Sequence, residues 1–214
     1  MTLNLDDMIR ILIIITFIPY WTCSVGYSQE WVKELQVGDT IPNELWSYPL
    51  RVINHPHGLD TVSLSDYRQK ELMILDFWSE GCTPCYMGFY RVDGLPERYT
   101  GLQFLLVNAR NPYRPDRTSA TRIRDVLTAL ISSMKFPNGL KTPSVVEDTV
   151  LTKLFPHRFV PHYVWIGGDG IVKKITQTNE VDEYNIRTFL YFDRRRRMME
   201  SGMSIEEIRK IHRF

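Results

Sequence analysis

The segment 72–78 is the feature of the sequence that most constrains the fold. It is a nearly continuous apolar run of strand length, interrupted only by Asp76. Such runs are typical of strands that are buried on both faces of a parallel or mixed sheet. A helical segment from Cys82 to about Tyr99 follows it, and then a second apolar run at 102–108. The order strand, helix, strand predicts a βαβ unit inside an α/β domain.

The segments around this unit predict further strands and helices. Strands are expected where aromatic and β-branched residues gather, and helices where apolar residues recur at helical spacing. An Asp-Gly turn within 167–170 predicts a hairpin between two of the strands. The expected strands lie at 46–53, 61–64, 145–146, 159–166 and 171–175. The expected helical segments lie at 65–66, 122–134, 149–155 and 182–192.

The composition excludes several classes of protein. Of the 214 residues, 43% are hydrophobic and 24% are charged, which excludes a chain that is disordered throughout. The 26 Lys and Arg residues nearly balance the 25 Asp and Glu residues, so the net charge of +1 offers no general attraction for nucleic acid. Three cysteines are too few for a scaffold held together by disulfides. The length suits one domain with extensions.

Both ends of the chain carry patterns of their own. Residues 1–28 place a charged start before the apolar run 11–18 and a stretch of small polar residues, an order that predicts a secretory signal peptide. An uncleaved N-terminal membrane anchor and a buried strand or helix are the alternatives. Residues 193–214 form a charged tail, in which the run Arg194–Arg197 predicts a solvated helix face rather than a binding patch.

Cys82 and Cys85 carry the chemistry predicted for this chain. Cys82 stands at the first turn of the expected helix, where unpaired backbone N–H groups and the positive end of the helix dipole stabilise a thiolate. Cys85 lies one turn further on, within bonding distance but less exposed, which suits it to resolve a mixed disulfide. Thr83 and Pro84 restrict the loop between them. Because the same spacing serves half of a zinc site, the context of the pair decides its meaning.

In its context the pair resembles the active site of the thioredoxin superfamily, in particular the secreted TlpA/ResA-like thiol-disulfide oxidoreductases. The resemblance rests on the segment 76–85, the Val160–Pro161 step before a strand, the turn at 168–170 and the opening loop 37–42. It implies a thioredoxin-like three-layer sandwich over residues 29–192. A central mixed sheet would be flanked by helices, with an N-terminal strand extension and an inserted helix.

The resemblance also assigns roles to the Val160–Pro161 step. It implies that this peptide bond is cis, that Pro161 shapes the substrate groove and that the backbone of Val160 pairs with the substrate chain. Trp78, Thr83 and Pro84 are expected to border the same groove, with Trp78 packed beneath the CxxC loop. An ordinary trans proline at the start of a strand is the alternative.

Asp76 is the most informative acid in the chain. It lies inside the apolar strand six residues before Cys82, where a lone carboxylate is costly unless it has partners or a function. Burial would raise its pKa and let it accept a proton from Cys85 as that thiol attacks the mixed disulfide. The resemblance implies the same role. A structural carboxylate that is hydrogen-bonded to backbone N–H groups is the alternative.

The surroundings of the pair depart from the family pattern and contain two histidines. Gly81 replaces the bulky residue that is common before the first cysteine, and Tyr90 replaces the proline that usually kinks the helix. His157 and His162 are expected to line the groove. Together with the two cysteines they could formally provide four zinc ligands. The long stretch between the cysteines and the histidines, and a cis proline against the sulfurs, disfavour a metal ion.

Together these residues predict a thiol-disulfide oxidoreductase that reduces disulfides of exported proteins without a cofactor. A membrane thiol electron donor would re-reduce it, and the N-terminal pattern indicates the periplasm or cell envelope. The alternatives are a peroxiredoxin-like thiol peroxidase and a non-catalytic thioredoxin-like redox sensor or binding domain. A vicinal cysteine pair argues against the peroxidase, whose chemistry uses a lone nucleophilic cysteine. The presence of both cysteines with Asp76 and Pro161 argues against the binding domain.

Overall fold

The computed structural model describes residues 33–111, 113–177 and 180–211. The signal-peptide or anchor prediction for residues 1–28 lies outside them. Among the described residues, no helix combines the length and the apolar character that a membrane crossing needs.

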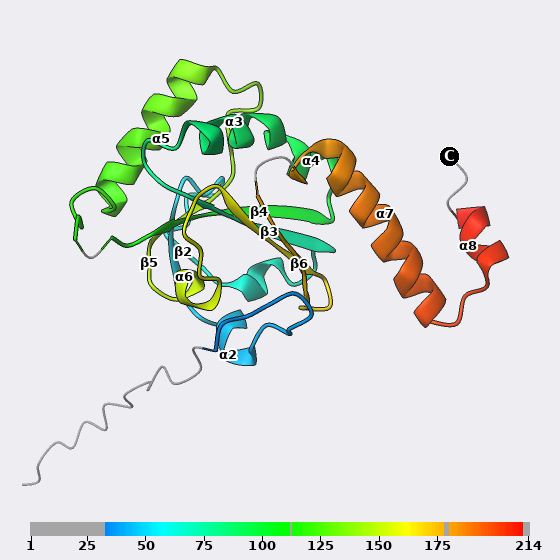
Figure 1. Cartoon of the computed structure of the whole chain (residues 1–214). Coiled ribbons are helices and arrows are strands. Elements are labelled where there is room, and N and C mark those ends of the chain that lie inside the picture. The colour runs from blue at the N-terminus through cyan, green and yellow to red at the C-terminus, as the bar shows by residue number, and fades with distance from the viewer. Residues whose placement is uncertain (1–32, 112, 178–179, 212–214) are drawn as a thin grey trace, which may run out of the picture. The chain divides into compact units, whose positions relative to one another are not determined.

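Seven strands form one sheet in the order β2-β1-β5-β4-β3-β6-β7 (Figure 1). The strands β3, β4 and β5 run parallel to one another. On one side β1 pairs antiparallel with β5 and β2 antiparallel with β1, and on the other side β6 pairs antiparallel with β3 and β7 antiparallel with β6. The sheet is therefore mixed, as predicted, and β1 with β2 forms the predicted strand extension at one edge. The strands are β1 (Leu50–Ile53), β2 (Thr61–Val62), β3 (Leu72–Trp78), β4 (Leu102–Ala109), β5 (Ser144–Asp148), β6 (His162–Gly167) and β7 (Val172–Thr176).

Helices cover both faces of this sheet. Figure 1 shows α3 and α5 on one side and α2 on the other. Phe155, directly after α6, contacts Phe77 on the side opposite α3. These layers confirm the predicted three-layer α/β architecture. The helices are α2 (Asn43–Trp46), α3 (Thr83–Val92), α4 (Leu95–Arg98), α5 (Ala120–Met134), α6 (Leu151–Leu154), α7 (Glu183–Glu200) and α8 (Ile205–Ile211), with a 3-10 helix at Leu64–Tyr67.

The strand β3 lies at the centre of the core, and all seven of its residues are buried. Side chains alternate between the two faces of a strand, so Asp76 and Trp78 point to one face and Phe77 to the other. Trp78 packs with residues of α3 and α5, which places Asp76 on the side of these helices. In register, Asp76 lies beside Leu106 of β4 and Tyr163 of β6.

Two predicted strands before β3 are shorter than expected. The strand predicted at 46–53 begins only at Leu50, because Pro42 precedes a short helix that includes Trp46. The ring of Trp46 is covered by the Arg68 guanidinium, 4.4 Å from its centroid. The strand predicted at 61–64 ends at Val62, and the 3-10 helix begins at Leu64.

The helical segment after Cys82 is divided into α3 and α4 at Gly94. This residue has a φ of 78°, which favours glycine, and a Cβ there would collide with the Asn138 amide. Asp93 is the C-cap residue of α3. Its carboxylate accepts hydrogen bonds from the backbone N–H groups of Asn138 at 2.7 Å and Leu140 at 3.1 Å. The break therefore has a tertiary cause as well as a local one.

The last predicted helix continues beyond Phe192. The observed α7 ends at Glu200, so the first part of the predicted tail is helical. Arg194 and Arg197 both bind the Glu71 carboxylate next to β3, at 2.6 Å and 2.8 Å. Arg196 contacts Asp169 in the turn between β6 and β7 at 3.4 Å. The arginine run is therefore only partly a solvated face, since three of its members attach α7 to the sheet.

Candidate active site

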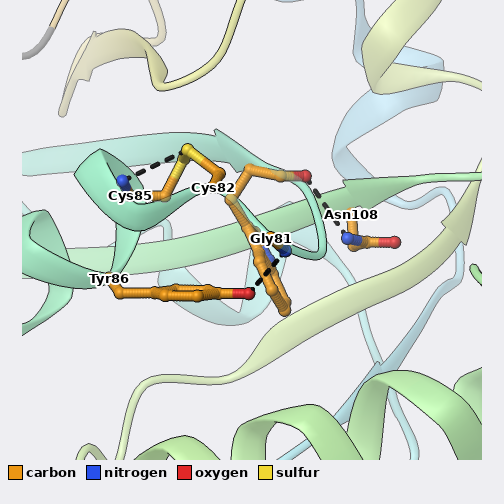
Figure 2. Close-up of a disulfide and its surroundings, with 6 residues drawn as sticks. Gly81, Cys82, Cys85, Tyr86 and Asn108 are labelled. Atoms are coloured by element: carbon orange, nitrogen blue, oxygen red, sulfur yellow. Dashed lines mark hydrogen bonds between the residues drawn. A yellow bond between two sulfur atoms is a disulfide. The ribbon is translucent and has the colours of Figure 1, made fainter. Parts of the chain in front are cut away.

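Cys82 and Cys85 form a disulfide at the N-terminus of α3 (Figure 2). Cys82 is the N-cap residue and is partly exposed, whereas Cys85 is completely buried. The structure confirms that Cys82 stands at the start of the helix and that Cys85 is the less exposed of the two. Cys82 is therefore the residue of the pair that a partner molecule can contact, whereas Cys85 is covered.

The backbone directs positive charge at the outer sulfur. The Cys85 N–H donates a hydrogen bond to the Cys82 Sγ at 3.2 Å, as Figure 2 shows. The N-terminal end of α3 adds the positive end of the helix dipole at the same place. Both effects favour the thiolate of Cys82 in the reduced pair, which is the nucleophilic form of the thiol.

Side chains from α3 and β4 support the loop that carries Cys82. The hydroxyl of Tyr86 accepts a hydrogen bond from the Gly81 N–H at 2.7 Å (Figure 2). The Asn108 side-chain amide donates to the Trp78 carbonyl at 3.3 Å. Sequence reasoning missed Tyr86 and Asn108, because their roles depend on contacts that no local motif announces.

Trp78 packs beneath the loop, as predicted. Its ring makes edge contacts with Phe89 at 5.5 Å and Tyr86 at 6.3 Å between centroids. Only 2% of Trp78 is exposed, so its predicted place at the border of the substrate groove is wrong: it supports the loop and offers no surface to a partner. Thr83 and Pro84 are exposed beside Cys82, where a partner can contact them.

An ion pair joins the CxxC loop to α5. Glu80, two residues before Cys82, binds the Arg122 guanidinium of α5, with the Nε at 3.2 Å from its Oε1. The pair borders a groove of about 620 Å³ that Tyr86 and one face of α5 also line. Sequence reasoning missed Arg122, which lies 40 residues beyond the first cysteine, so no spacing rule relates the two.

Asp76 is completely buried, and neither of its carboxylate oxygens has a hydrogen-bond partner among the described residues. Burial raises the pKa of Asp76 well above its usual value, and the charge of Arg91 opposes this only in part. The alternative of a structural carboxylate bonded to backbone N–H groups does not match this environment. The proton transfer expected of Asp76 stays a prediction.

The Val160–Pro161 peptide bond is cis, as the resemblance implied. The strand β6 begins directly after it, at His162, and not at residue 159. Val160 is partly exposed and packs on the same apolar cluster as Cys82 and Trp78. The structure therefore brings Val160 and the cysteine pair to one place, while contact with a substrate stays a prediction.

His157 and His162 do not line the groove, and this prediction is wrong. Their rings stack at 4.7 Å and both pack on Phe77, which points to the face opposite Trp78. Burial and the neighbouring His157 lower the pKa of His162 to about 4, so its ring is neutral at physiological pH. Within the described ranges, no three His, Cys, Asp or Glu side chains gather where they could hold a metal ion.

Comparison with known proteins gives structural likeness only. No family model and no curated protein sequence matches the chain. The thioredoxin domain of a thiol-disulfide oxidoreductase from Bacteroides vulgatus is 15% identical, with a TM-score of 0.53 over 73% of this chain and 99% of that domain. A Chlorobium tepidum protein described as a thiol:disulfide interchange protein DsbE is 20% identical, with the same TM-score and the same coverage of both chains.

A third structure, of a thioredoxin-like protein in its oxidised form, is 15% identical with a TM-score of 0.52. It covers 74% of this chain and 97% of its own. All three likenesses lie at low identity and concern the course of the backbone. Together with the sheet order and the βαβ unit around the cysteine pair, they show that the chain has the thioredoxin-like fold.

Proposed function

We propose that this protein is a thiol-disulfide oxidoreductase that reduces disulfides of exported proteins. One observation carries the proposal: the bonded pair of Cys82 and Cys85 begins a helix, with Cys82 partly exposed, Cys85 buried and the buried carboxyl of Asp76 on the same side of the sheet. The likeness to thiol-disulfide oxidoreductases of known structure supports it.

In the first step the reduced protein attacks its client. The Cys82 thiolate forms a bond to one sulfur of the client disulfide, and the bond between the two client sulfurs breaks. The departing client thiolate takes a proton from solvent, and a mixed disulfide joins Cys82 to the client. The backbone of Val160 holds the client chain, the buried Pro161 shapes the groove from beneath, and Thr83 and Pro84 border it, as the resemblance implies.

In the second step Cys85 releases the client. Its thiol gives a proton to the Asp76 carboxylate, and the resulting thiolate attacks the Cys82 sulfur. The client leaves as its second thiolate, and the pair becomes the disulfide seen in the structure. The client has then gained two electrons and the pair has lost two. Burial raises the pKa of Asp76 and so brings it closer to the pKa of a thiol. The smaller difference in pKa favours proton transfer from Cys85 to Asp76.

Return to the dithiol requires two electrons and two protons, which a donor with two thiols supplies as it becomes a disulfide. We assign this role to a membrane thiol electron donor, since the N-terminal sequence pattern indicates export to the periplasm or cell envelope. A measurement of the reduction potential of the pair against glutathione or dithiothreitol buffers tests the direction. A reducing potential supports the proposal, whereas a strongly oxidising one reverses the assigned direction.

Trapping tests the mechanism itself. Reduced Cys85→Ser should form a stable mixed disulfide with a client that contains a disulfide, because the resolving thiol is missing. Cys82→Ser is the matched control and should form none. Non-reducing gels and mass spectrometry detect the adduct, and dithiothreitol should dissolve it. Absence of the adduct in Cys85→Ser, or faster reaction of the wild-type pair with hydrogen peroxide than with disulfides, contradicts the proposal and favours the peroxidase.

A further inference from the structure

Four exposed arginines and two exposed aromatic residues stand on two segments that leave the sheet near the cysteine pair. One segment lies between β4 and α5, and the other directly precedes the cis proline. The aromatic side chains are open to solvent, Tyr113 being 90% and Phe159 76% exposed. We call the set the arginine–aromatic surface, and its members are Arg110, Tyr113, Arg114, Arg117, Arg158 and Phe159.

The strand directions bring both segments to the edge of the sheet that holds the cysteine pair. β3 and β4 are parallel neighbours, so the chain leaves both strands at the same edge. Cys82 comes soon after β3, and Arg110 comes directly after β4. β6 runs antiparallel to β3, with His162 beside Phe77, so the residues before His162 reach that edge as well. This is the edge at which sheets of this class bind their ligands.

Contacts across this edge hold the segment between β4 and α5 in place. At its start, the Arg110 N–H donates a hydrogen bond to the Asp148 carbonyl of β5 at 2.9 Å. After its end, Arg122 in the first turn of α5 binds Glu80 of the Cys82 loop, with the Nε at 3.2 Å from the Oε1. The segment is therefore attached beside the loop that carries the exposed cysteine.

The acids at this edge leave the arginines of the surface without partners. Three of these acids already have partners: Glu80 and Glu147 bind arginines outside the surface, and Asp148 accepts backbone N–H groups at the start of α6. Arg114 has an ion pair only with the exposed Asp116, at 3.9 Å. Among the described residues, no side-chain hydrogen bond or ion pair is made by Arg110, Arg117 or Arg158. In a chain of net charge +1, the surface is a local excess of positive charge.

The residue types of the surface are those that recognise proteins. Tyrosine, phenylalanine and arginine are enriched at protein interfaces, whereas lysine and glutamate are depleted, and the surface contains neither of these two. A guanidinium group binds a carboxylate through two parallel hydrogen bonds. Arg194 does this within the chain, with two nitrogens each 2.6 Å from a Glu71 oxygen. The arginines of the surface are free to do the same with carboxylates of another molecule.

We propose that the arginine–aromatic surface binds an acidic segment of the client protein that flanks the client disulfide. The inference rests on the function proposed above, which brings a protein chain to Cys82, and it names the class of client. Asp and Glu side chains of the segment pair with the arginines, and the rings of Tyr113 and Phe159 cover its apolar parts. Opposite charges also speed the encounter of the two proteins. The exchange of bonds at Cys82 stays as described above.

A first experiment tests the preference for acidic clients with two synthetic peptides. Each peptide contains one intramolecular disulfide, and the aspartates that flank it in one peptide are lysines in the other. Second-order rate constants of reduction by the reduced wild-type protein, measured by acid quench and mass spectrometry, are divided by those for dithiothreitol to remove the intrinsic reactivity of each peptide. The acidic peptide should react about tenfold faster, and added salt should diminish this preference. Equal rate constants, or faster reaction of the basic peptide, overturn the proposal.

A second experiment removes one arginine from each segment. The double variant Arg110→Gln, Arg158→Gln should reduce the acidic peptide about fivefold more slowly, because two exposed ion pairs with the client are lost. Its rate with the uncharged hydroxyethyl disulfide should equal that of the wild type. The matched control Arg209→Gln, Lys210→Gln removes two exposed charges from the C-terminal helix α8 and should change neither rate. An equal loss in the control overturns the assignment to this surface.

Two other results of the second experiment also overturn the proposal. A slower reaction of the Arg110, Arg158 variant with hydroxyethyl disulfide would mean that the arginines change the reactivity of Cys82 and do not select the client. Weaker binding of this variant to phosphatidylglycerol vesicles, with unchanged peptide rates, would assign the surface to a membrane.

Failure of the proposed function is distinguishable from failure of this inference. If the reduced wild-type protein reduces neither hydroxyethyl disulfide nor either peptide, the oxidoreductase itself is overturned. Binding of the two fluorescently labelled peptides to the oxidised protein, measured by anisotropy, then still decides the surface. The acidic peptide should bind more tightly than the basic one, and about fivefold more weakly to the Arg110, Arg158 variant than to the wild type. Equal affinities overturn the inference.

Discussion

The burial of Asp76 predicts a specific dependence of stability on pH. Burial raises its pKa from the usual 3.8, so above pH 3.8 the unfolded chain releases a proton that the folded protein keeps. The free energy of unfolding therefore falls as pH rises from 3.8 to the pKa of the folded state, and this contribution is constant above that pKa. Asp76→Asn, which has a neutral side chain of similar shape, removes this dependence.

The size of the effect follows from the completely buried, unpartnered carboxyl. One proton corresponds to a slope of about 1.4 kcal/mol per pH unit. The difference in unfolding free energy, Asp76→Asn minus wild type, should therefore grow with pH at up to about this slope. The buried amide of asparagine has its own cost at every pH, so the slope is diagnostic and the absolute difference is not.

Urea unfolding of the oxidised proteins, followed by tryptophan fluorescence between about pH 4 and about pH 8, measures the two free energies. All other titrating groups are common to both proteins and cancel in the difference. Parallel curves, with a difference that does not depend on pH, would refute the reasoning. They would mean that Asp76 has the same pKa in the folded and unfolded states, so that burial does not raise the pKa of this carboxyl.

Three further changes test the surroundings of the site. Tyr86→Phe removes the acceptor of the Gly81 N–H and should lower the free energy of unfolding in urea by about 1 kcal/mol. The rate at which reduced Cys82 is alkylated should also change. Wild-type values of both quantities would contradict the role of Tyr86 in loop support. Burial disfavours the charge of Glu71, but Arg194 and Arg197 outweigh this effect and lower the pKa of Glu71. The ion pairs therefore stabilise the protein fully at pH values above the usual carboxyl pKa. This stabilisation is lost as the pH falls through the lowered pKa. Glu71→Gln should therefore lower the free energy of unfolding by about 1 kcal/mol at neutral pH, seen as a lower melting temperature, and by much less in acid. An equal loss at both pH values would contradict the ion pairs. Gly94→Ala should cost about 1–3 kcal/mol in urea, because it strains the left-handed turn and meets Asn138, and an unchanged midpoint would show that the turn tolerates a side chain.

The parts of the fold that sequence could predict are those with a local cause. The bounds of β3 agree with the apolar run, because charged or turn-forming residues flank it on both sides. The Asp-Gly turn predicted the hairpin of β6 and β7, and the position of Cys82 followed from its place between a strand and a helix. Each of these features depends on residues that are close in the sequence.

The remaining features depend on contacts between distant segments. Trp46 has a strong preference for strands, yet it lies in a helix and is covered by Arg68. The two histidines stand near Pro161 in the sequence, but the alternation of β6 turns His162 toward Phe77 on the other face. The length of α7 is supported by ion pairs to Glu71, more than 100 residues earlier.

The differences from the family pattern gather around α3 and leave the two sulfurs in place. Gly81 has no side chain before Cys82, and its N–H is instead held by Tyr86. Tyr90, where the pattern has a proline, keeps its backbone N–H and packs against Phe136 at 5.7 Å, so α3 continues to Val92. Because the disulfide, the helix start and the buried acid depend on none of these positions, substitutions here should change client choice and rates before they change the chemistry.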